Sequence, residues 1–186
     1  MNEQRPVPYR VAVPALIRSV VNIGRPLALR TILLEEHVGM RLRFADETSA
    51  RVYRETVVDR GVTENSGALP VQFRLRFVRG WGHTLFRSER LLNAPLFVGF
   101  PGYVSKLWLA SDEHGVYRGI YEWDGPERAA FYGRCLSRVI ELGCMPGSIH
   151  YQVLPGLHRD EFLAESHLLT GVAPEVKAWW RPSKVA

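Results

Sequence analysis

The chain has 186 residues, of which 46% are hydrophobic and 23% are charged, and its formal net charge is +5. This length allows one domain with a sizeable core plus additions, and the composition is ordinary for a soluble globular protein. No stretch approaches the roughly 18 apolar residues of a membrane span. The arginines that supply most of the positive charge are scattered along the chain, which favours a solvated basic surface over a nucleic-acid partner.

Cys135 and Cys144 are the two cysteines, and they form neither a CxxC pair nor a zinc-binding spacing. We interpret them as reduced thiols of a cytoplasmic protein. The first residues lack a charged segment followed by a continuous apolar run, so no signal peptide is expected.

Residues 1–62 are predicted to form an extension of helices and one hairpin. Pro14 can open a first helix, and Pro26 can open a second helix that runs through Leu34. Arginines lie among the apolar residues here, as they do in helices that rest on a membrane surface. Packing on the protein's own domain or on a partner subunit is the commoner use of such helices, and we favour it. Strands over residues 40–44 and 50–58 form the hairpin.

The core, residues 63–156, alternates strands and helices in the order βαββαβ. Strands are predicted over residues 69–78, 103–110, 116–123 and 147–154, and a first helix over 82–93. The second helix has Asp124 as its cap, Pro126 in its first turn and Gly143 at its end. This order is typical of a ferredoxin-like α+β fold, with an antiparallel sheet and two helices on one face.

Residues 157–186 form a tail with two short helical candidates, over 159–168 and 174–180. Trp179 and Trp180 would each leave a large apolar surface in water, so we expect them to dock on the core or on a partner. A nucleobase-stacking platform is the alternative, but it needs a basic groove that the sequence pattern does not provide.

Alternation divides the core strands into an apolar face and a polar face. The apolar parity holds Val71, Phe73, Leu75, Phe77, Tyr117, Tyr121, Trp123, Ile149, Tyr151 and Val153. The polar parity holds Gln72, Arg74, Arg76, Arg118, Glu122, His150 and Gln152. An extension of helix and hairpin is not needed on an already soluble surface, so we expect that extension or a partner subunit to cover the polar face. We therefore predict an enclosed polar pocket.

Three runs in the core, FPGYVSKLW (100–108), YRGIYEW (117–123) and AAFY (129–132), resemble a known family. They are similar to the dimeric α+β barrel superfamily, and within it to small monooxygenase-like proteins related to antibiotic-biosynthesis monooxygenases. The resemblance spans about half the chain, residues 69–154. It implies a homodimer whose two sheets face each other to make a barrel with helices outside. The superfamily also contains isomerases, haem enzymes and proteins without known activity, so the fold does not define the chemistry.

His150 is the first candidate for chemistry, because it lies on the polar face near the expected paths of Arg118 and Glu122 and can act as a general base. A structural hydrogen bond to Glu122 or Gln152 is the alternative. Arg74, Arg76 and Arg118 can bind a carboxylate, a phenolate or an enolate and stabilise developing charge. A structural salt-bridge network with Glu122 is the alternative for these arginines.

Two aromatic residues complete the candidate site. Trp108 can stack on an aromatic ligand or fill the core, and His83 can reach the pocket mouth or stand at the surface start of a helix. Motifs for dinucleotides, phosphates, zinc and serine hydrolysis are absent, so no cofactor and no metal are predicted. A haem held by His150 or His83 is a third option.

The predicted function is a small, cofactor-independent monooxygenase-like enzyme, or a related isomerase or cyclase, acting on an aromatic or polyketide-like molecule. His150 removes a proton, and Arg118 and Arg76 stabilise the anion. The predicted substrate contacts are Arg74, Glu122, Trp108, His83 and Gln152. The alternative is a non-enzymatic protein that binds a small ligand or a partner. An enclosed pocket with His150 and an arginine favours the enzyme, whereas a sheet face filled by packed side chains favours the binding protein.

Overall fold

The computed structural model of the chain describes residues 5–22, 31–32, 36–58, 65–76, 99–164 and 178–185. The predicted helix over 82–93, with His83, lies outside these ranges. In chain order the elements are α1 (Tyr9–Asn22), β1 (Thr31–Ile32), β2 (Arg41–Phe44), β3 (Ser49–Val58), β4 (Ser66–Arg74), β5 (Tyr103–Leu109), β6 (Val116–Asp124), α6 (Pro126–Ile140), β7 (His150–Tyr151), β8 (Leu154–Pro155), α7 (Arg159–Ala164) and β9 (Pro182–Val185).

The described strands form one antiparallel sheet in the order β7-β4-β6-β5-β3-β2-β9, while β1 pairs with β3 and β8 pairs with β4. The four core strands in chain order are β4, β5, β6 and β7. In the sheet they lie in the order β7-β4-β6-β5, that is fourth, first, third, second, which is the ferredoxin-like arrangement. The predicted α+β fold is therefore confirmed. The hairpin of residues 40–58 does not stand apart from the core, because β3 pairs directly with β5.

The turn between β5 and β6 forms as its residues predict. Asp112 Oδ1 accepts hydrogen bonds from the backbone N–H groups of His114 and Val116, both at 2.9 Å. Gly115 has a φ of 73°, a conformation that glycine adopts without steric cost. This turn brings His114 and Asp112 to the edge where the candidate site lies.

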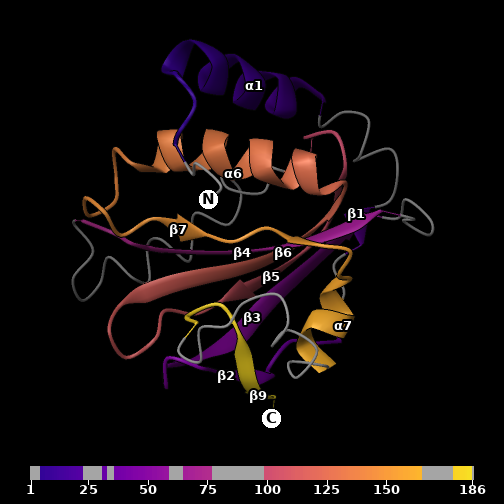
Figure 1. The fold of residues 1–186 in the computed structure, drawn as a ribbon, viewed down its shortest axis with the longest axis vertical. Coiled ribbons are helices and arrows are strands. Elements are labelled where there is room, and N and C mark those ends of the chain that lie inside the picture. Colours follow the sequence, from indigo (N-terminus) through magenta and orange to yellow (C-terminus); the bar gives the residue numbers. More distant parts are fainter. Residues whose placement is uncertain are drawn as a thin grey trace.

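Helix α6 covers one face of the sheet, and α1 lies on α6 as an outer layer (Figure 1). Tyr132 and Cys135 of α6 are fully buried against the apolar face, where Trp123 and Tyr103 are also fully buried. The predicted apolar parity of β4 and β6 therefore faces the helices. Ala12 and Leu16 bury the inner side of α1, so the expectation that the first helix packs on its own domain is confirmed.

The ends of the helices differ from the prediction. Gly125, not Asp124, is the N-cap of α6, and Asp124 instead forms an ion pair with Arg128 at 2.8 Å. Gly143 does not end α6 with a positive φ; the C-cap is the right-handed Glu141, and the Gly143 N–H donates to the Ile140 carbonyl at 2.9 Å.

The amino-terminal helices also differ. α1 begins five residues before Pro14, and the Pro8 carbonyl accepts from Val11 and Ala12, so the first turn forms ahead of the proline. The prediction of a second helix is wrong for Thr31–Ile32, because these two residues form strand β1 opposite Val57 and Val58. Pairing with an existing strand overrides the helical pattern there.

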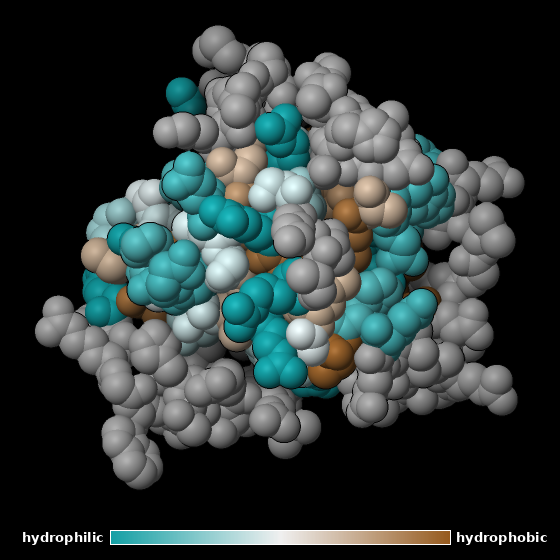
Figure 2. Space-filling model, turned by 90° about the horizontal axis from the view of Figure 1, so that it is seen from below, coloured by the Kyte–Doolittle hydropathy of each residue, from teal (hydrophilic) through white to brown (hydrophobic). Residues whose placement is uncertain are grey.

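The face of the sheet away from α6 is covered by the chain itself. The pairing of β3 with β5 has a register shift between Val52 and Arg54. A second hydrophobic cluster lies on this side. Its largest members are Leu42, Phe44, Leu107, Leu109, Ile120, Leu154, Phe162 and Trp180. The sequence-based view of an enclosed polar chamber across this face is therefore wrong, because Ile120 and its neighbours fill the middle. Seen from this side, hydrophilic side chains cover much of the described surface, with hydrophobic areas between them (Figure 2).

The tail and α7 close this second cluster. Trp180 is 5% exposed and lies beside Phe162, which confirms that the tail docks on the core. Residues 178–180 form a turn rather than the end of the predicted helix, and β9 then pairs with β2. Arg159 of α7 reaches Glu55 of β3 at 2.7 Å, and His37 Nδ1 reaches the same carboxylate at 3.0 Å. The ion pair between Arg159 and the buried Glu55 carboxylate thus holds α7 to the sheet.

Candidate functional site

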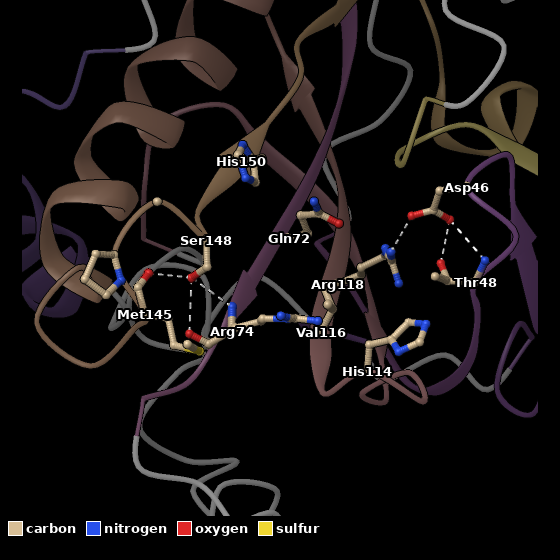
Figure 3. A pocket seen from close by; sticks show the side chains of 12 residues that line it. Asp46, Thr48, Gln72, Arg74, His114, Val116, Arg118, Met145, Ser148 and His150 are labelled. Atoms are coloured by element: carbon tan, nitrogen blue, oxygen red, sulfur yellow. Dashed lines mark hydrogen bonds and ion pairs between the residues drawn. The ribbon is translucent and has the colours of Figure 1, made fainter.

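A pocket of about 430 Å³ lies at the polar end of this face, where β4, β6 and β7 meet two turns. Its lining residues are Asp46, Thr48, Gln72, Arg74, His114, Val116, Arg118, Met145, Pro146, Gly147, Ser148 and His150. Figure 3 shows their side chains around the pocket. The pocket is partly open to solvent and is not the enclosed chamber that the sequence predicts.

Strand register explains why three of the predicted residues meet here. Gln72 of β4 lies opposite Arg118 of β6 on one side and opposite His150 of β7 on the other. Arg74 follows Gln72 by two residues and so faces the same way. With strands about 4.8 Å apart, Arg118 and His150 flank Gln72 across roughly 10 Å. The prediction that Arg74, Arg118 and His150 share one face is confirmed.

Arg118 is neutralised by two carboxylates. Its side chain is 3% exposed, and its guanidinium lies 2.6 Å from Asp112 and 3.0 Å from Asp46. The guanidinium also lies over the Phe44 ring, at 4.6 Å from the centroid. Arg118 therefore ties the β2–β3 turn to the β5–β6 turn and forms a wall of the pocket. A salt bridge of Arg118 with Glu122 is the alternative that the sequence offers, but the partners of Arg118 are these two aspartates.

Two buried polar atoms at the pocket have no hydrogen-bond partner among the described residues. They are Nε of Arg118, which can only donate, and Oε1 of Gln72, which can only accept. A buried polar atom that stays unpaired costs about 1–3 kcal/mol. A single hydroxyl or water within hydrogen-bond distance of both atoms would satisfy them, because it accepts and donates at once.

Arg74, His114 and His150 are exposed side chains that line the pocket. In Figure 3 the Arg74 side chain extends between His114 and Ser148, below His150. Its backbone is held by Ser148, whose Oγ accepts from the Arg74 N–H at 3.2 Å. No acidic group among the described residues forms an ion pair with its guanidinium. Arg74 is thus available to an anion, whereas Arg118 is not.

His150 is exposed, and its ring lies 6.4 Å from the ring of Trp179. Among the described residues, no side chain hydrogen-bonds its imidazole, so the alternative of a structural hydrogen bond to Glu122 or Gln152 is wrong. Gln152 is instead turned to the Val153 carbonyl, at 3.3 Å. His150 is therefore accessible to a hydrogen-bonding group of a ligand.

Glu122 lies at the opposite end of the face. Ala68 is its partner on β4, four residues or roughly 13 Å along the strand from Gln72. Its carboxylate accepts from Ser105 and contacts His158 Nδ1 at 2.9 Å. The expectation that Glu122 lies near His150 is therefore wrong, because Glu122 pairs with Ala68 whereas His150 pairs with Gln72.

Ser66, His158 and Glu122 gather without forming a catalytic triad. Ser66 Oγ and Glu122 Oε1 both contact Nδ1 of His158, at 2.8 and 2.9 Å. A serine–histidine–carboxylate triad uses one ring nitrogen for each partner, so this arrangement is not a triad. Ser66 Oγ also donates directly to Glu122 Oε1 at 3.2 Å.

The remaining predicted residues lie elsewhere. Arg76 is next to Gly143, to which its backbone N–H donates at 2.9 Å, and it does not line the pocket. Trp108 lies on the helix-facing side, is 8% exposed, and donates from Nε1 to Thr56 at 3.1 Å. Trp108 therefore packs in the core.

Lys106 accompanies Trp108 on that side. Its ammonium lies 3.2 Å from the Trp108 ring centroid and 4.6 Å from that of Tyr121. Burial, and then the neighbouring Arg54 charge, lowers the pKa of Lys106 well below its usual value. Burial raises the pKa of Tyr121 and of Tyr132. These groups lie away from the pocket, on the other side of the sheet.

Sequence reasoning missed His114, Asp46, Asp112 and Ser148, all of which lie on turns. Among the described residues, no group of three or more histidine, cysteine, aspartate or glutamate side chains could hold a metal ion. No described helix is long and apolar enough to cross a bilayer.

No protein-family model and no curated protein matches the chain. Among solved structures, it is similar to an uncharacterised ferredoxin-fold protein of Listeria monocytogenes 4b F2365 related to antibiotic biosynthesis monooxygenases. That match has 14% identity and a TM-score of 0.43, and covers 60% of this chain and 66% of that one, just under two thirds. A monooxygenase-like protein of Listeria innocua matches at 12% identity and a TM-score of 0.40, covering 60% and 67%. A major regulator of staphylococcal pathogenesis matches at 13% identity and a TM-score of 0.39, covering 60% and 69%.

Proposed function

We propose that the pocket between β4, β6 and β7 binds a small organic anion that also carries a hydroxyl group. The observation that carries this proposal is the pair of unpaired buried atoms, Arg118 Nε and Gln72 Oε1, at the wall of the pocket. A ligand hydroxyl between them accepts from the arginine and donates to the glutamine.

The anionic group of the ligand is assigned to Arg74. Its guanidinium is exposed in the same pocket and can hold a carboxylate or a phenolate through two parallel hydrogen bonds. The hydroxyl and the anion together define an aromatic hydroxy acid, or the enol form of a polyketide-like molecule.

Hydroxybenzoates are suitable probes, with benzoate as the matched ligand that lacks the hydroxyl. Calorimetry should show that Gln72→Leu weakens hydroxybenzoate about fivefold, the effect of one neutral hydrogen bond, and leaves benzoate unchanged. Arg74→Gln should weaken both ligands by about tenfold or more, because a charge-assisted bond is lost. Arg10→Gln, on α1, makes the same charge change away from the pocket and should have no effect. Equal losses in Arg74→Gln and Arg10→Gln, or no binding of either ligand, would refute the proposal.

Catalysis is the second candidate, and the position of His150 favours it. His150 flanks Gln72 on the side opposite Arg118, within reach of a group bound there. As general base it would take a proton from the ligand hydroxyl or from an adjacent carbon, and Arg74 would stabilise the resulting anion. Oxygenation would then use O₂: a substrate methylene loses its two hydrogens and gains one oxygen atom, and the second oxygen leaves as water. The substrate supplies the electrons, so no external reductant is needed.

Turnover of electron-rich hydroxyaromatic substrates, followed by oxygen consumption, tests this activity. His150→Gln should lower kcat while the affinity for hydroxybenzoate stays nearly the same. Binding without any turnover would leave the protein as a ligand-binding protein. Unchanged turnover in His150→Gln would exclude His150 as the base.

A further inference from the structure

The outer face of α1 exposes an unusual number of apolar side chains. The exposed fractions are 43% for Tyr9, 42% for Val13, 56% for Ile17 and 74% for Val21, and we call these four residues the outer stripe. Val11 is a further exposed apolar residue of α1, at 40%. In the part of the chain that the structure describes, eight large hydrophobic residues are exposed, and five of them belong to this helix.

Packing within the chain accounts for one member of the outer stripe only, Tyr9, whose ring centroid lies 4.9 Å from Arg138 Cζ of α6. Ala12, Leu16 and Ser19 are buried on the opposite side of α1 and make its contact with the domain. The four residues of the outer stripe recur every four positions, which places them along one side of the helix. α1 is the outermost layer above α6 in Figure 1, so this side lies at the surface of the molecule.

The charges that α1 itself contributes beside the outer stripe are all positive, and the acidic Glu141 at the C-cap of α6, near Tyr9, is already paired with Arg138 at 3.0 Å. Residues 5–22 contain Arg5, Arg10 and Arg18 and no aspartate or glutamate. Arg10 and Arg18 are exposed on α1, on one flank of the outer stripe. An apolar stripe bordered by arginines is the pattern of helices that lie in the interface of a bilayer.

A second copy of the chain is the competing occupant. A two-fold contact through the outer stripe would bring Arg10 and Arg18 of one copy against the same residues of the other, without an acidic residue on either helix. Anionic lipid headgroups complement these charges instead. We propose that α1 docks the protein on an anionic lipid surface, with the outer stripe at the boundary between headgroups and acyl chains.

A vesicle-binding experiment with the full chain tests this proposal. Binding to vesicles of phosphatidylcholine mixed with phosphatidylserine should exceed binding to pure phosphatidylcholine and should fall as salt rises. Ile17→Asp should lower the partition coefficient by about tenfold or more, since one apolar side chain leaves the interface. Arg10→Gln and Arg18→Gln should each lower it by about fivefold.

Matched variants separate docking by α1 from general attraction of a basic protein. Val38 has the same exposed fraction as Val13, 42%, but lies outside α1, so Val13→Asp should weaken binding and Val38→Asp should not. Arg41→Gln removes the same charge from β2 and should have little effect. Equal losses in Arg41→Gln and Arg10→Gln, or no preference for anionic vesicles, would overturn the proposal. A dimer in solution that Ile17→Asp dissociates would also overturn it, because the outer stripe would then belong to a second copy.

Discussion

Arg118 Nη1 donates to Asp112 Oδ2 across 2.6 Å, and the two side chains are only 3% and 0% exposed. Removing one member of a buried pair leaves the other as an uncompensated charge, at a cost of about 3–5 kcal/mol. Arg118→Leu should therefore lower the free energy of unfolding by that amount in urea titrations. Arg128→Leu is the control, because its pair with Asp124 is about half exposed, at 48% and 45%, and should contribute about 0–1 kcal/mol. Similar losses in both variants would mean that the Arg118 pair is not buried in solution.

Trp180→Ala should be among the most destabilising changes in the tail. The side chain is 5% exposed and packs beside Phe162, so its removal leaves a cavity that costs about 3–5 kcal/mol. Trp179→Ala, at the half-buried neighbouring position, should cost clearly less. Thermal unfolding of the two variants measures the difference, and an equal effect would argue against the docked position of Trp180.

Lys106→Met should stabilise the protein, and the gain should depend on pH. Burial lowers the pKa of Lys106 in the folded state, while the unfolded chain keeps its proton up to about the ordinary value of 10.5. Between these two pKa values the unfolded state binds more protons, so the stability of the wild type rises with pH. The advantage of Lys106→Met is therefore largest below the folded-state pKa and disappears as the pH passes 10.5. Urea titrations across this range test the prediction, and a variant that is less stable at every pH would contradict it.

Cys135 and Cys144 should resist alkylation while the protein is folded. Both are buried, and burial raises the pKa of each thiol to about 11, so little of the reactive thiolate forms at neutral pH. Mass spectrometry after maleimide treatment at neutral pH should show no modification of the folded chain and two modifications in urea. Rapid labelling of the native protein would show that the segment around one thiol opens readily.

The parts of the fold that the sequence predicted are those set by short-range pattern. β5 and β6 are rich in β-branched and aromatic residues, and the turn at Asp112 and Gly115 carries its own hydrogen-bonding chemistry. β1 and β9 were missed because strands of two and four residues depend on partners elsewhere in the chain. Ile120 shows a different error. It lies between Arg118 and Glu122 on the face that was predicted to be polar, but it is buried in the second hydrophobic cluster.

The candidate site was predictable only in part for the same reason. Alternation brings Arg74, Arg118 and His150 to one face, because parity is a local property of each strand. Asp46, His114 and Ser148 come from turns that meet only after the sheet has formed. The separation of Glu122 from His150 depends on how far β7 extends along β4, which no local pattern encodes.

The pairing of β2 with β9 has a consequence for the order of assembly. Ser183 Oγ donates to the Arg43 carbonyl, so two segments 140 residues apart share one ladder. During synthesis, β2 emerges long before its partner and presents unpaired N–H and C=O groups along a bare edge. That edge is where nascent chains would cross-associate, and a chaperone or fast translation through the tail would protect it.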